Sequence, residues 1–301
     1  MAIQKEIWQQ SIVEGLFAPN SFLSKAVNAD EYVNAGKVVH IPQAGKASSV
    51  TKNRSTVPAK ATMRNDTDIN FTLNEYTTDP IIIPHADTVE LSYDKRASVL
   101  RQDKLALFDA VALDFLHDWS PAADNVIQTT GEAVAAYTPS ATGNRKAVTK
   151  ADVLTLMTKF NADNIPQDGR YLLLDAYMYA QLLNDLTANE NSAFLASADA
   201  QRGVLGQLHS FNIMMRSQVT LYAAAKTVKT WSEEGAATDC AAALAWHEQS
   251  VCRALGEVVA YENEDDATYY GSVYSFLVRA GGHIMRSDNK GVMALMQAAA
   301  E

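Results

Sequence analysis

The fold is decided by residues 38–73, which read VVHIPQAGKASSVTKNRSTVPAKATMRNDTDINFTL. The β-branched run at the start of this stretch and the alternating Ile69, Phe71 and Leu73 at its end predict two strands. The 26 residues that separate the strands, Gln43 to Asp68, are mostly Ser, Thr, Lys, Gly, Ala and other small or polar residues. Connections longer than about 15 residues are uncommon inside a compact domain, and this one is too polar to build a core. The sequence therefore predicts an extended hairpin or flexible loop.

This segment, which we call the basic loop (residues 43–68), differs in charge from the rest of the chain. Residues 37–64 contain no acid and six cations, namely Lys37, Lys46, Lys52, Arg54, Lys60 and Arg64. The whole chain of 301 residues has 25 Lys and Arg against 35 Asp and Glu, a net charge of −10. An acidic chain argues against nucleic acid as the main partner, and the loop has no aromatic residues for base stacking. Any contact of the loop with DNA is expected to be unspecific.

An acidic run near the C-terminal end is the counterpart of the basic loop. It contains Glu257, Glu262, Glu264, Asp265 and Asp266, with no Lys or Arg between Ala254 and Val278. The two segments are either separate solvated faces or the two halves of a contact between copies of the chain. In the second interpretation the contact residues are Lys46, Lys52, Arg54, Lys60 and Arg64 on one copy and Glu262, Glu264, Asp265 and Asp266 on the next. A surface ion pair contributes only about 0–1 kcal/mol, so charge would set the register while apolar burial holds the contact.

Residues 1–35 form an arm with a partly helical apolar pattern that is broken by the turn signal Pro19-Asn20. These apolar residues have no dense apolar segment near them in the sequence. They are therefore expected to dock on another part of the fold or on another chain, and docking on a neighbour is our hypothesis. The docking residues in this hypothesis are Ile7, Trp8, Leu16 and Phe17.

A long helix follows the strands, with Ser92 as its N-cap and its end near Trp119, before Pro121. Its apolar residues form one stripe: Leu100, Leu107, Phe108, Val111 and Phe115. About 27 residues at 1.5 Å each make a helix roughly 40 Å long, which is a spine for the fold. Residues 121–147 are rich in Ala, Thr, Gly and Pro without periodicity, and they are expected to be a linker.

A second unit, of α+β or α/β type, begins at Thr149, where Asp152 three residues later predicts a capped helix. The turn signal at 166–169 precedes a buried strand over 171–174, and Asp175 caps another helix. Strands are expected at 211–216, 241–246 and 258–261, with a short helix over 248–255. The last strand-like segments, 270–280 and 291–295, are expected to return to an earlier sheet.

The sequence contains no pattern that predicts a catalytic, metal or cofactor site. The glycine-rich phosphate loops and the nucleophile elbow are absent, and His247-Glu248 lacks the second His of a zinc-protease helix. Cys240, His247 and Cys252 fit buried positions better than a metal site. With two cysteines, no signal peptide and no long apolar run, the chain is not expected to be disulfide-stapled, exported or membrane-spanning. A soluble α/β enzyme using Asp175, His209 and Glu248 is an alternative, although no spacing favours it.

The order of arm, polar loop, spine helix and α+β unit resembles the Hong Kong 97-like fold of tailed-phage major capsid proteins. Residues 36–42 resemble the strand that enters the extended E-loop of that family, and residues 172–183 its strand-to-helix step. Residues 203–217 and 270–295 are similar to its later turn and closing strands. The resemblance covers nearly the whole chain.

The resemblance implies an α+β fold with an N-terminal arm (1–35), an E-loop with flanking P-domain strands (36–91), and a P-domain spine helix with linker (92–147). An A-domain (148–256) and closing strands that return to the P-domain (257–301) complete it. It also implies a structural protein without catalysis or cofactor. Such proteins assemble as hexamers and pentamers into an icosahedral shell around double-stranded DNA. An encapsulin-type protein compartment has the same fold and is the alternative.

The resemblance further implies partners and a location. Because the arm begins almost at Met1, a separate scaffolding protein or an already processed chain is expected, together with a portal and capsid accessory proteins. Assembly would take place in the host bacterial cytoplasm and the product would be the virion capsid. Some family members cross-link a loop Lys to an Asn. Lys46, Lys52 and Lys60 lie in the matching loop, but the sequence identifies no partner for them and we predict no cross-link.

Overall fold

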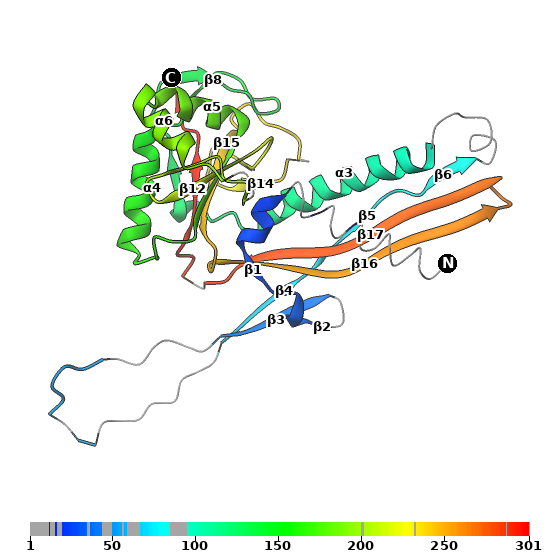
Figure 1. The fold of residues 1–301 in the computed structure, drawn as a ribbon, viewed down its shortest axis with the longest axis horizontal. Coiled ribbons are helices and arrows are strands. Elements are labelled where there is room, and N and C mark those ends of the chain that lie inside the picture. The colour runs from blue at the N-terminus through cyan, green and yellow to red at the C-terminus, as the bar shows by residue number, and fades with distance from the viewer. Residues whose placement is uncertain are drawn as a thin grey trace.

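The computed structural model describes Ile12, Leu16 and residues 20–34, 37–43, 50–55, 57–58, 67–84, 95–199, 202–231, 233–286 and 288–300. Figure 1 shows three parts: a long narrow sheet with a helix along it, a unit of helices around a second sheet, and a projecting loop. The predicted α+β class is confirmed. None of the helices within these described ranges is long and apolar enough to cross a membrane.

The predicted hairpin at the base of the basic loop is confirmed. Strands β3 (Val38–Gln43) and β4 (Thr67–Thr72) pair antiparallel from Val38 opposite Thr72 to Gln43 opposite Thr67. β2 (Val33–Asn34) adds to β3, and the 3-10 turn η2 (Asp30–Tyr32) precedes it. The apolar side chains of this hairpin pack against the start of β16, whereas residues 50–55 of the loop lie far from the other elements (Figure 1).

The long sheet is built on two paired strands, β16 (Val251–Asp266) and β17 (Gly271–Ile284). β5 (Asn74–Thr77) and β6 (Ile81–Pro84) pair with β17, and β1 (Val27–Asn28) runs parallel to β16. The helix expected over 248–255 is therefore wrong, because β16 begins at Val251 after a short turn. Val251, Cys252 and Ala254 are all fully buried, and strand pairing over a distance of more than 20 residues overrides the apparent helical spacing.

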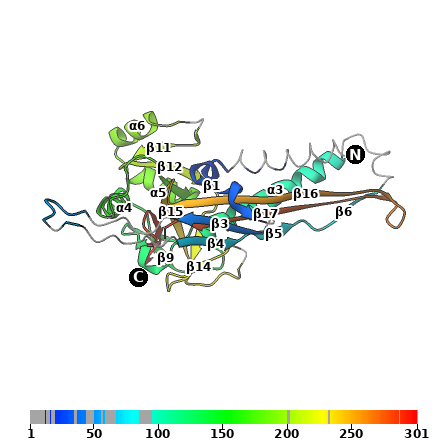
Figure 2. The same cartoon turned by 90° about the horizontal axis from the view of Figure 1, so that it is seen from below.

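The spine helix is α3 (Lys95–Asp118), and it runs lengthwise along this sheet (Figure 2). Its predicted apolar stripe is buried and belongs to one core cluster with Tyr274, Phe276 and Val278 of β17. Trp119 ends the helix fully buried, and its Nε1 donates a hydrogen bond to the Cys252 carbonyl at 2.8 Å. The predicted N-cap, Ser92, lies outside the described residues.

The second unit has a central sheet in the order β11-β12-β10-β15-β13-β14, to which β18 and β7 also belong. Its strands are β7 (Val126–Gln128), β10 (Arg170–Asp175), β11 (Gly206–Leu208), β12 (Phe211–Arg216), β13 (Thr220–Tyr222), β14 (Val228–Lys229), β15 (Cys240–His247) and β18 (Val292–Met296). The helices are α4 (Lys150–Ala162), α5 (Ala176–Asp185) and α6 (Ala188–Ala196). The caps are confirmed: Thr149 and Asp152 form a capping box, and the Asp175 carboxylate accepts from the Met178 N–H.

The segment expected to be a linker contains regular structure. Residues 121–147 are more than a linker, because they contribute the 3-10 turn η3 (Ala123–Asn125), β7 in the central sheet, and β8 (Ala133–Ala135) with β9 (Asn144–Lys146). The expectation that the last strand-like segments return to earlier sheets is confirmed, because β17 pairs with β5 and β6, and β18 pairs with β15 and β7. β18 thereby joins the central sheet of the second unit, and β19 (Ala299–Ala300) pairs with β9. β7, β8, β9 and β19 have only two or three residues each, which is too short for a periodic signal in the local sequence.

The arm packs on its own chain at the two positions described before Asn20. Leu16 is 2% exposed and Ile12 1% exposed, and both belong to the core cluster that includes Phe22, Leu23 and the stripe of α3. Phe22 and Leu23 lie in the 3-10 turn η1 (Ser21–Lys25). The neighbour-docking hypothesis is therefore contradicted at Leu16, which packs on its own chain. Ile7, Trp8 and Phe17 lie outside the described residues.

Candidate assembly interface

The basic loop presents both charged and apolar side chains to solvent. Lys52 and Arg54 are exposed, and the apolar Val50 is 98% exposed. The Arg54 guanidinium donates to the Thr51 hydroxyl at 3.4 Å, a contact within the loop itself. Lys46, Lys60 and Arg64 lie outside the described residues. The described part of the loop thus has the features of a surface that needs a partner to bury it.

The fold itself uses two carboxylates of the acidic run. Glu257 pairs with Arg279 at 3.2 Å, and Arg279 also pairs with Glu75 at 2.8 Å. Asp266 closes the hairpin turn by accepting from the Asn263 amide at 2.6 Å and from the Thr268 N–H at 2.8 Å. Two of the five acids therefore serve the fold of β16 and its turn.

The remaining acids lie on the outer half of the β16–β17 hairpin. Glu264 is exposed, Glu262 is half-buried, and Asp265 lies in β16. Figure 1 places this hairpin and the basic loop at opposite ends of the molecule, so one chain cannot bring them together. Any contact between them joins two copies.

Sequence reasoning missed the aromatic side chains at the tip of this hairpin. Tyr261, Tyr269 and Tyr270 are all more than half exposed, Tyr270 to 83%. The signal was the Tyr269-Tyr270-Gly271 step two residues after the acidic run, where a turn between two long strands exposes both rings. Exposed tyrosines supply apolar area with a polar tip, which is typical of protein interfaces.

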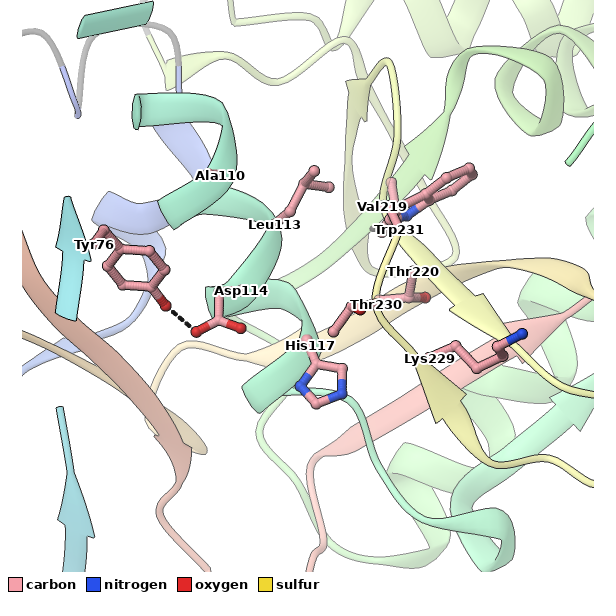
Figure 3. A pocket seen from close by; sticks show the side chains of 10 residues that line it. All are labelled: Tyr76, Ala110, Leu113, Asp114, His117, Val219, Thr220, Lys229, Thr230 and Trp231. Atoms are coloured by element: carbon pink, nitrogen blue, oxygen red, sulfur yellow. Dashed lines mark hydrogen bonds between the residues drawn. The ribbon is translucent and has the colours of Figure 1, made fainter. Parts of the chain in front are cut away.

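A cleft of about 260 Å³ lies where the spine helix meets the second unit (Figure 3). Its lining residues are Tyr76, Ala110, Leu113, Asp114, His117, Val219, Thr220, Lys229, Thr230 and Trp231. The Asp114 carboxylate accepts hydrogen bonds from the Asn74 amide at 2.8 Å and from the Tyr76 hydroxyl. Burial, together with Asp114, raises the pKa of Tyr76 and keeps its hydroxyl a donor.

Carboxylates surround the His117 imidazole at one side of the cleft. The Asp118 carboxylate, 3.9 Å from the His117 Nδ1, raises the pKa of His117 against the effect of burial, and the nearby charges of Asp114 and Glu233 add to this rise. His117, Asp114 and Asp118 also place one nitrogen and two oxygens within 4.8 Å of one another. Asp118 further accepts from the Gly282 N–H at 3.0 Å. These bonds fix the carboxylates on the sheet, and no metal site is assigned to them.

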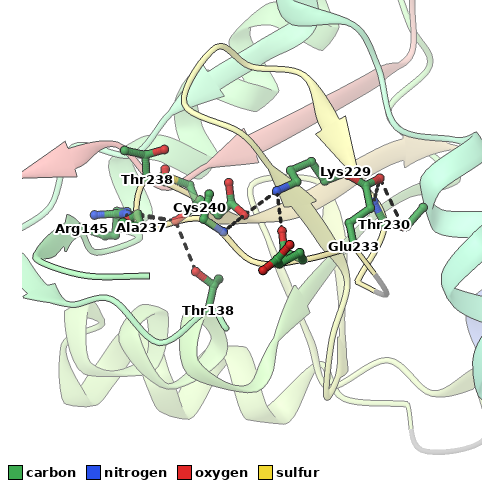
Figure 4. Close-up of polar contacts among 11 residues, drawn as sticks. Thr138, Arg145, Lys229, Thr230, Glu233, Ala237, Thr238 and Cys240 are labelled. Carbon is green, nitrogen blue, oxygen red and sulfur yellow. Dashed lines mark hydrogen bonds and ion pairs between the residues drawn. The ribbon is translucent and has the colours of Figure 1, made fainter. Parts of the chain in front are cut away.

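The opposite wall of the cleft is held by a buried polar network (Figure 4). The Lys229 ammonium pairs with Asp239 at 2.8 Å, and the same carboxylate accepts from the Ala236 N–H. Arg145 donates to the carbonyls of Ala237 and Asp239, at 2.9 and 3.0 Å for its Nη2. Lys229, Asp239 and Arg145 thus link the segment between β14 and β15, which carries Trp231, to β9.

The structure does not bring the alternative catalytic or metal residues together. Asp175 is the last residue of β10 and pairs with Arg216 of β12. Glu248 follows the end of β15, and His209 lies between β11 and β12. Both therefore lie near the other end of β10, where Arg170 begins the strand. Cys240 and Cys252 are buried, and burial raises the pKa of both thiols, that of Cys252 to about 12. Neither cysteine belongs to a cluster of potential metal ligands in the described part of the chain.

The chain has the fold of phage capsid proteins. The capsid of Ralstonia phage GP4 superposes with a TM-score of 0.66 at 14% identity, over 92% of this chain and 88% of that chain. A capsid structure of cyanophage P-SCSP1u gives 0.61 at 16% identity, covering 92% and 86%, and the cyanophage Pam1 capsid gives 0.60 at 14% identity, covering 95% and 92%. No protein-family model and no curated protein matches the sequence. The resemblance inferred from the sequence is therefore confirmed at the level of the fold.

Proposed function

We propose that the chain is the structural major capsid protein of a tailed double-stranded DNA phage. It assembles as hexamers and pentamers into an icosahedral shell that encloses the genome. The observation that carries this proposal is the match to phage capsid structures over about nine tenths of the chain. The proposed regions are the arm (1–35), the E-loop (36–91), the spine-helix region (92–147), the A-domain (148–256) and the closing strands (257–301).

The described part of the basic loop supports assembly because the described residues of its own chain leave it exposed. Val50 and Val57 are almost fully exposed, and Lys52 and Arg54 make no ion pair with described residues. Burial of about 25 cal/mol per Å² of apolar surface would hold such a loop on a neighbouring copy. Glu264 and the exposed tyrosines of the β16–β17 hairpin offer one such neighbouring surface.

The partners that we propose beyond the shell itself follow from the fold alone. They are a scaffolding protein, a portal, capsid accessory proteins and unspecific contact with packaged DNA. Assembly in the bacterial cytoplasm belongs to the same proposal.

Electron microscopy of the expressed chain tests the proposal directly. We expect closed shells when the full chain is expressed alone or with a phage scaffolding protein. A preparation that stays monomeric in both cases would refute the proposal. Nucleic acid inside the particles would support a phage capsid, whereas enzyme cargo would indicate an encapsulin-type compartment.

A loop variant tests the role of charge in assembly. We expect K52E/R54E to slow shell formation strongly, because it replaces two exposed cations with two acids. The matched control is R101E/K159E, which changes the charge equally at exposed positions on α3 and α4. Equal assembly rates for both variants, followed by light scattering, would remove the basic loop from the interface.

A further inference from the structure

We propose that residues 20–30, which we call the clasp, hold the second unit in one orientation on the long sheet, and that drawing the arm off the chain releases this unit. The clasp consists of η1, β1 and the start of η2. It lies where the spine helix, the long sheet and the second unit meet (Figure 1). The clasp acts within one chain, so it does not depend on the shell that the chain builds.

Main-chain hydrogen bonds fix the clasp to the long sheet. β1 runs parallel to the start of β16. The fully buried Ala29 donates its N–H to the Arg253 carbonyl at 2.8 Å. The Asp30 carboxylate accepts from the Leu255 N–H at 2.7 Å. The sheet end of the clasp is therefore its firmer end.

Side chains make the contacts between the clasp and the second unit. The Trp246 Nε1 donates to the Lys25 carbonyl at 2.9 Å. The Lys25 ammonium lies 5.9 Å from the centre of the Tyr171 ring, and the Arg216 guanidinium lies 6.0 Å from the centre of the Phe22 ring. Each contact of this kind is weak on its own. The clasp therefore separates more readily from the second unit than from the long sheet.

Phe22 fills the space between the two units. It is 2% exposed, and its ring meets the Trp119 ring edge-on, with the ring centres 5.9 Å apart. Trp119 ends the spine helix, and its ring centre lies 5.8 Å from that of Trp246 in the central sheet. Because protein interiors are close-packed, loss of Phe22 leaves a cavity beside both indole rings.

The other connections between the units are short enough to serve as a hinge. The chain crosses at Ser120–Ala122 after the spine helix, between β15 and β16, and between β17 and β18. A few residues in such connections can absorb the change in backbone angles when one unit turns against another. An open clasp therefore leaves the units joined but free to turn.

The arm before the clasp packs in the same core. Ile12 and Leu16 belong to the apolar cluster that contains Phe22, the stripe of α3 and side chains of the central sheet. The Asn20 amide, 3% exposed, donates to the Leu16 carbonyl at 3.1 Å. Drawing the arm away thus removes side chains from the core that closes the clasp.

Gly203 of the second unit offers a way to push the clasp away. A Cβ atom at Gly203 would overlap the Ser21 Oγ and lie 3.1 Å from the Ser21 Cβ. Gly203→Ala should therefore displace the clasp, and Ser21→Gly, which removes both Ser21 atoms, should restore it. Gly143 is the matched control, because its φ of +77° resembles the +68° of Gly203 and nothing lies within 4 Å of an added Cβ.

Pulsed EPR distances between two spin labels test the clasp in the full-length chain, kept below its assembly concentration. Cys240 and Cys252 are buried, so the labels go to introduced cysteines. Ala106→Cys on α3 and Lys159→Cys on α4 lie at exposed positions, one on the spine helix and one on the second unit. Lys159→Cys with Ser192→Cys on α6 is the control pair, because both positions belong to the second unit.

We expect Phe22→Ala, Gly203→Ala and Leu16→Asp each to widen the distance distribution between the units at least twofold. The double variant Ser21→Gly/Gly203→Ala and the control Gly143→Ala should keep the width of the wild-type chain. The distribution of the control pair within the second unit should stay unchanged in all five variants.

Each other result would overturn the inference. An unchanged width in Phe22→Ala or Gly203→Ala would show that the clasp does not set the orientation. Widening in Gly143→Ala, or no recovery in the double variant, would assign the effect to backbone strain instead. Equal widening of the control pair would show that these residues only support the fold of the second unit. An unchanged width in Leu16→Asp would overturn release by the arm.

Discussion

Gly282 lies where the spine helix packs most tightly on the long sheet. A Cβ atom at this position would come within 2.6 Å of the Trp119 Nε1, 3.0 Å of its Cδ1 and 3.1 Å of the Phe115 Cδ1. The Trp119 indole is fully buried and donates to the Cys252 carbonyl, so it cannot move without losing that bond. We therefore predict that Gly282→Ala destabilises the folded chain.

The magnitude follows from two effects. Forcing an extra methyl group into a packed core costs about 1–3 kcal/mol. Loss or distortion of the Trp119 hydrogen bond adds about 1 kcal/mol. The free energy of unfolding should thus fall by about 2–4 kcal/mol.

The adjacent Gly281 provides a matched control on the other face of β17. There a Cβ would approach the end of the Leu73 side chain at 3.2 Å, with the nearest backbone atoms at 3.5 Å. Alanine is favoured over glycine within a strand by about 0.5–1 kcal/mol, so Gly281→Ala should be neutral or slightly stabilising. Urea unfolding of the unassembled chain, followed by tryptophan fluorescence, measures both variants. Equal unfolding free energies for the two would refute the packing argument.

Three further predictions concern the second unit and the cleft. Arg170→Met should lower the unfolding free energy by about 3–5 kcal/mol in the same urea assay, because this fully buried guanidinium satisfies the Pro166 and Ile165 carbonyls. Arg170→Lys should recover part of that loss, and full recovery would contradict the role of the planar guanidinium. Thr149→Ala should cost about 1 kcal/mol through loss of the capping box, whereas a change below 0.3 kcal/mol would contradict it. His117 has a raised pKa in the folded chain, so its charged form stabilises the fold below about pH 6.5 and this contribution disappears as pH rises through the raised pKa. His117→Gln should therefore lose stability relative to the wild-type chain at pH 5.5 but not at pH 8.5, and an equal loss at both would contradict the assignment.

Elements with a local chemical signal could be predicted from the sequence. The capping residues Thr149 and Asp175 predict the start of α4 and α5, and the apolar stripe predicts α3. The polar run between Val38 and Leu73 predicted an extended hairpin or flexible loop, because such a long polar connection cannot build a core of its own. These signals act within about one turn or one strand, so one sequence is sufficient to read them.

Elements defined by distant pairing could not be predicted in the same way. Val251 and Leu255 have helical spacing, yet Val251 pairs with Ile284 and Leu255 with Ala280. Within 121–147, β7 pairs with β18 and β9 pairs with β19, both near the C-terminal end, and β8 then pairs with β9. In both cases the decisive hydrogen bonds are made by residues that a local window does not contain.

Charged surfaces are likewise hard to locate from the local sequence. A run of acids on a strand alternates between two faces and meets its neighbours on adjacent strands, which is why Glu257 is paired with Arg279. Asp114 and Asp118 lie four positions apart on one helix face, where side chains are neighbours, and Glu233 joins them from a segment more than 100 residues away. The concentrated negative charge therefore arises beside α3, where the sequence shows only isolated acids. A run of acids in the sequence therefore does not by itself identify a negatively charged surface, because the fold pairs some of its members and gathers acids from other segments elsewhere.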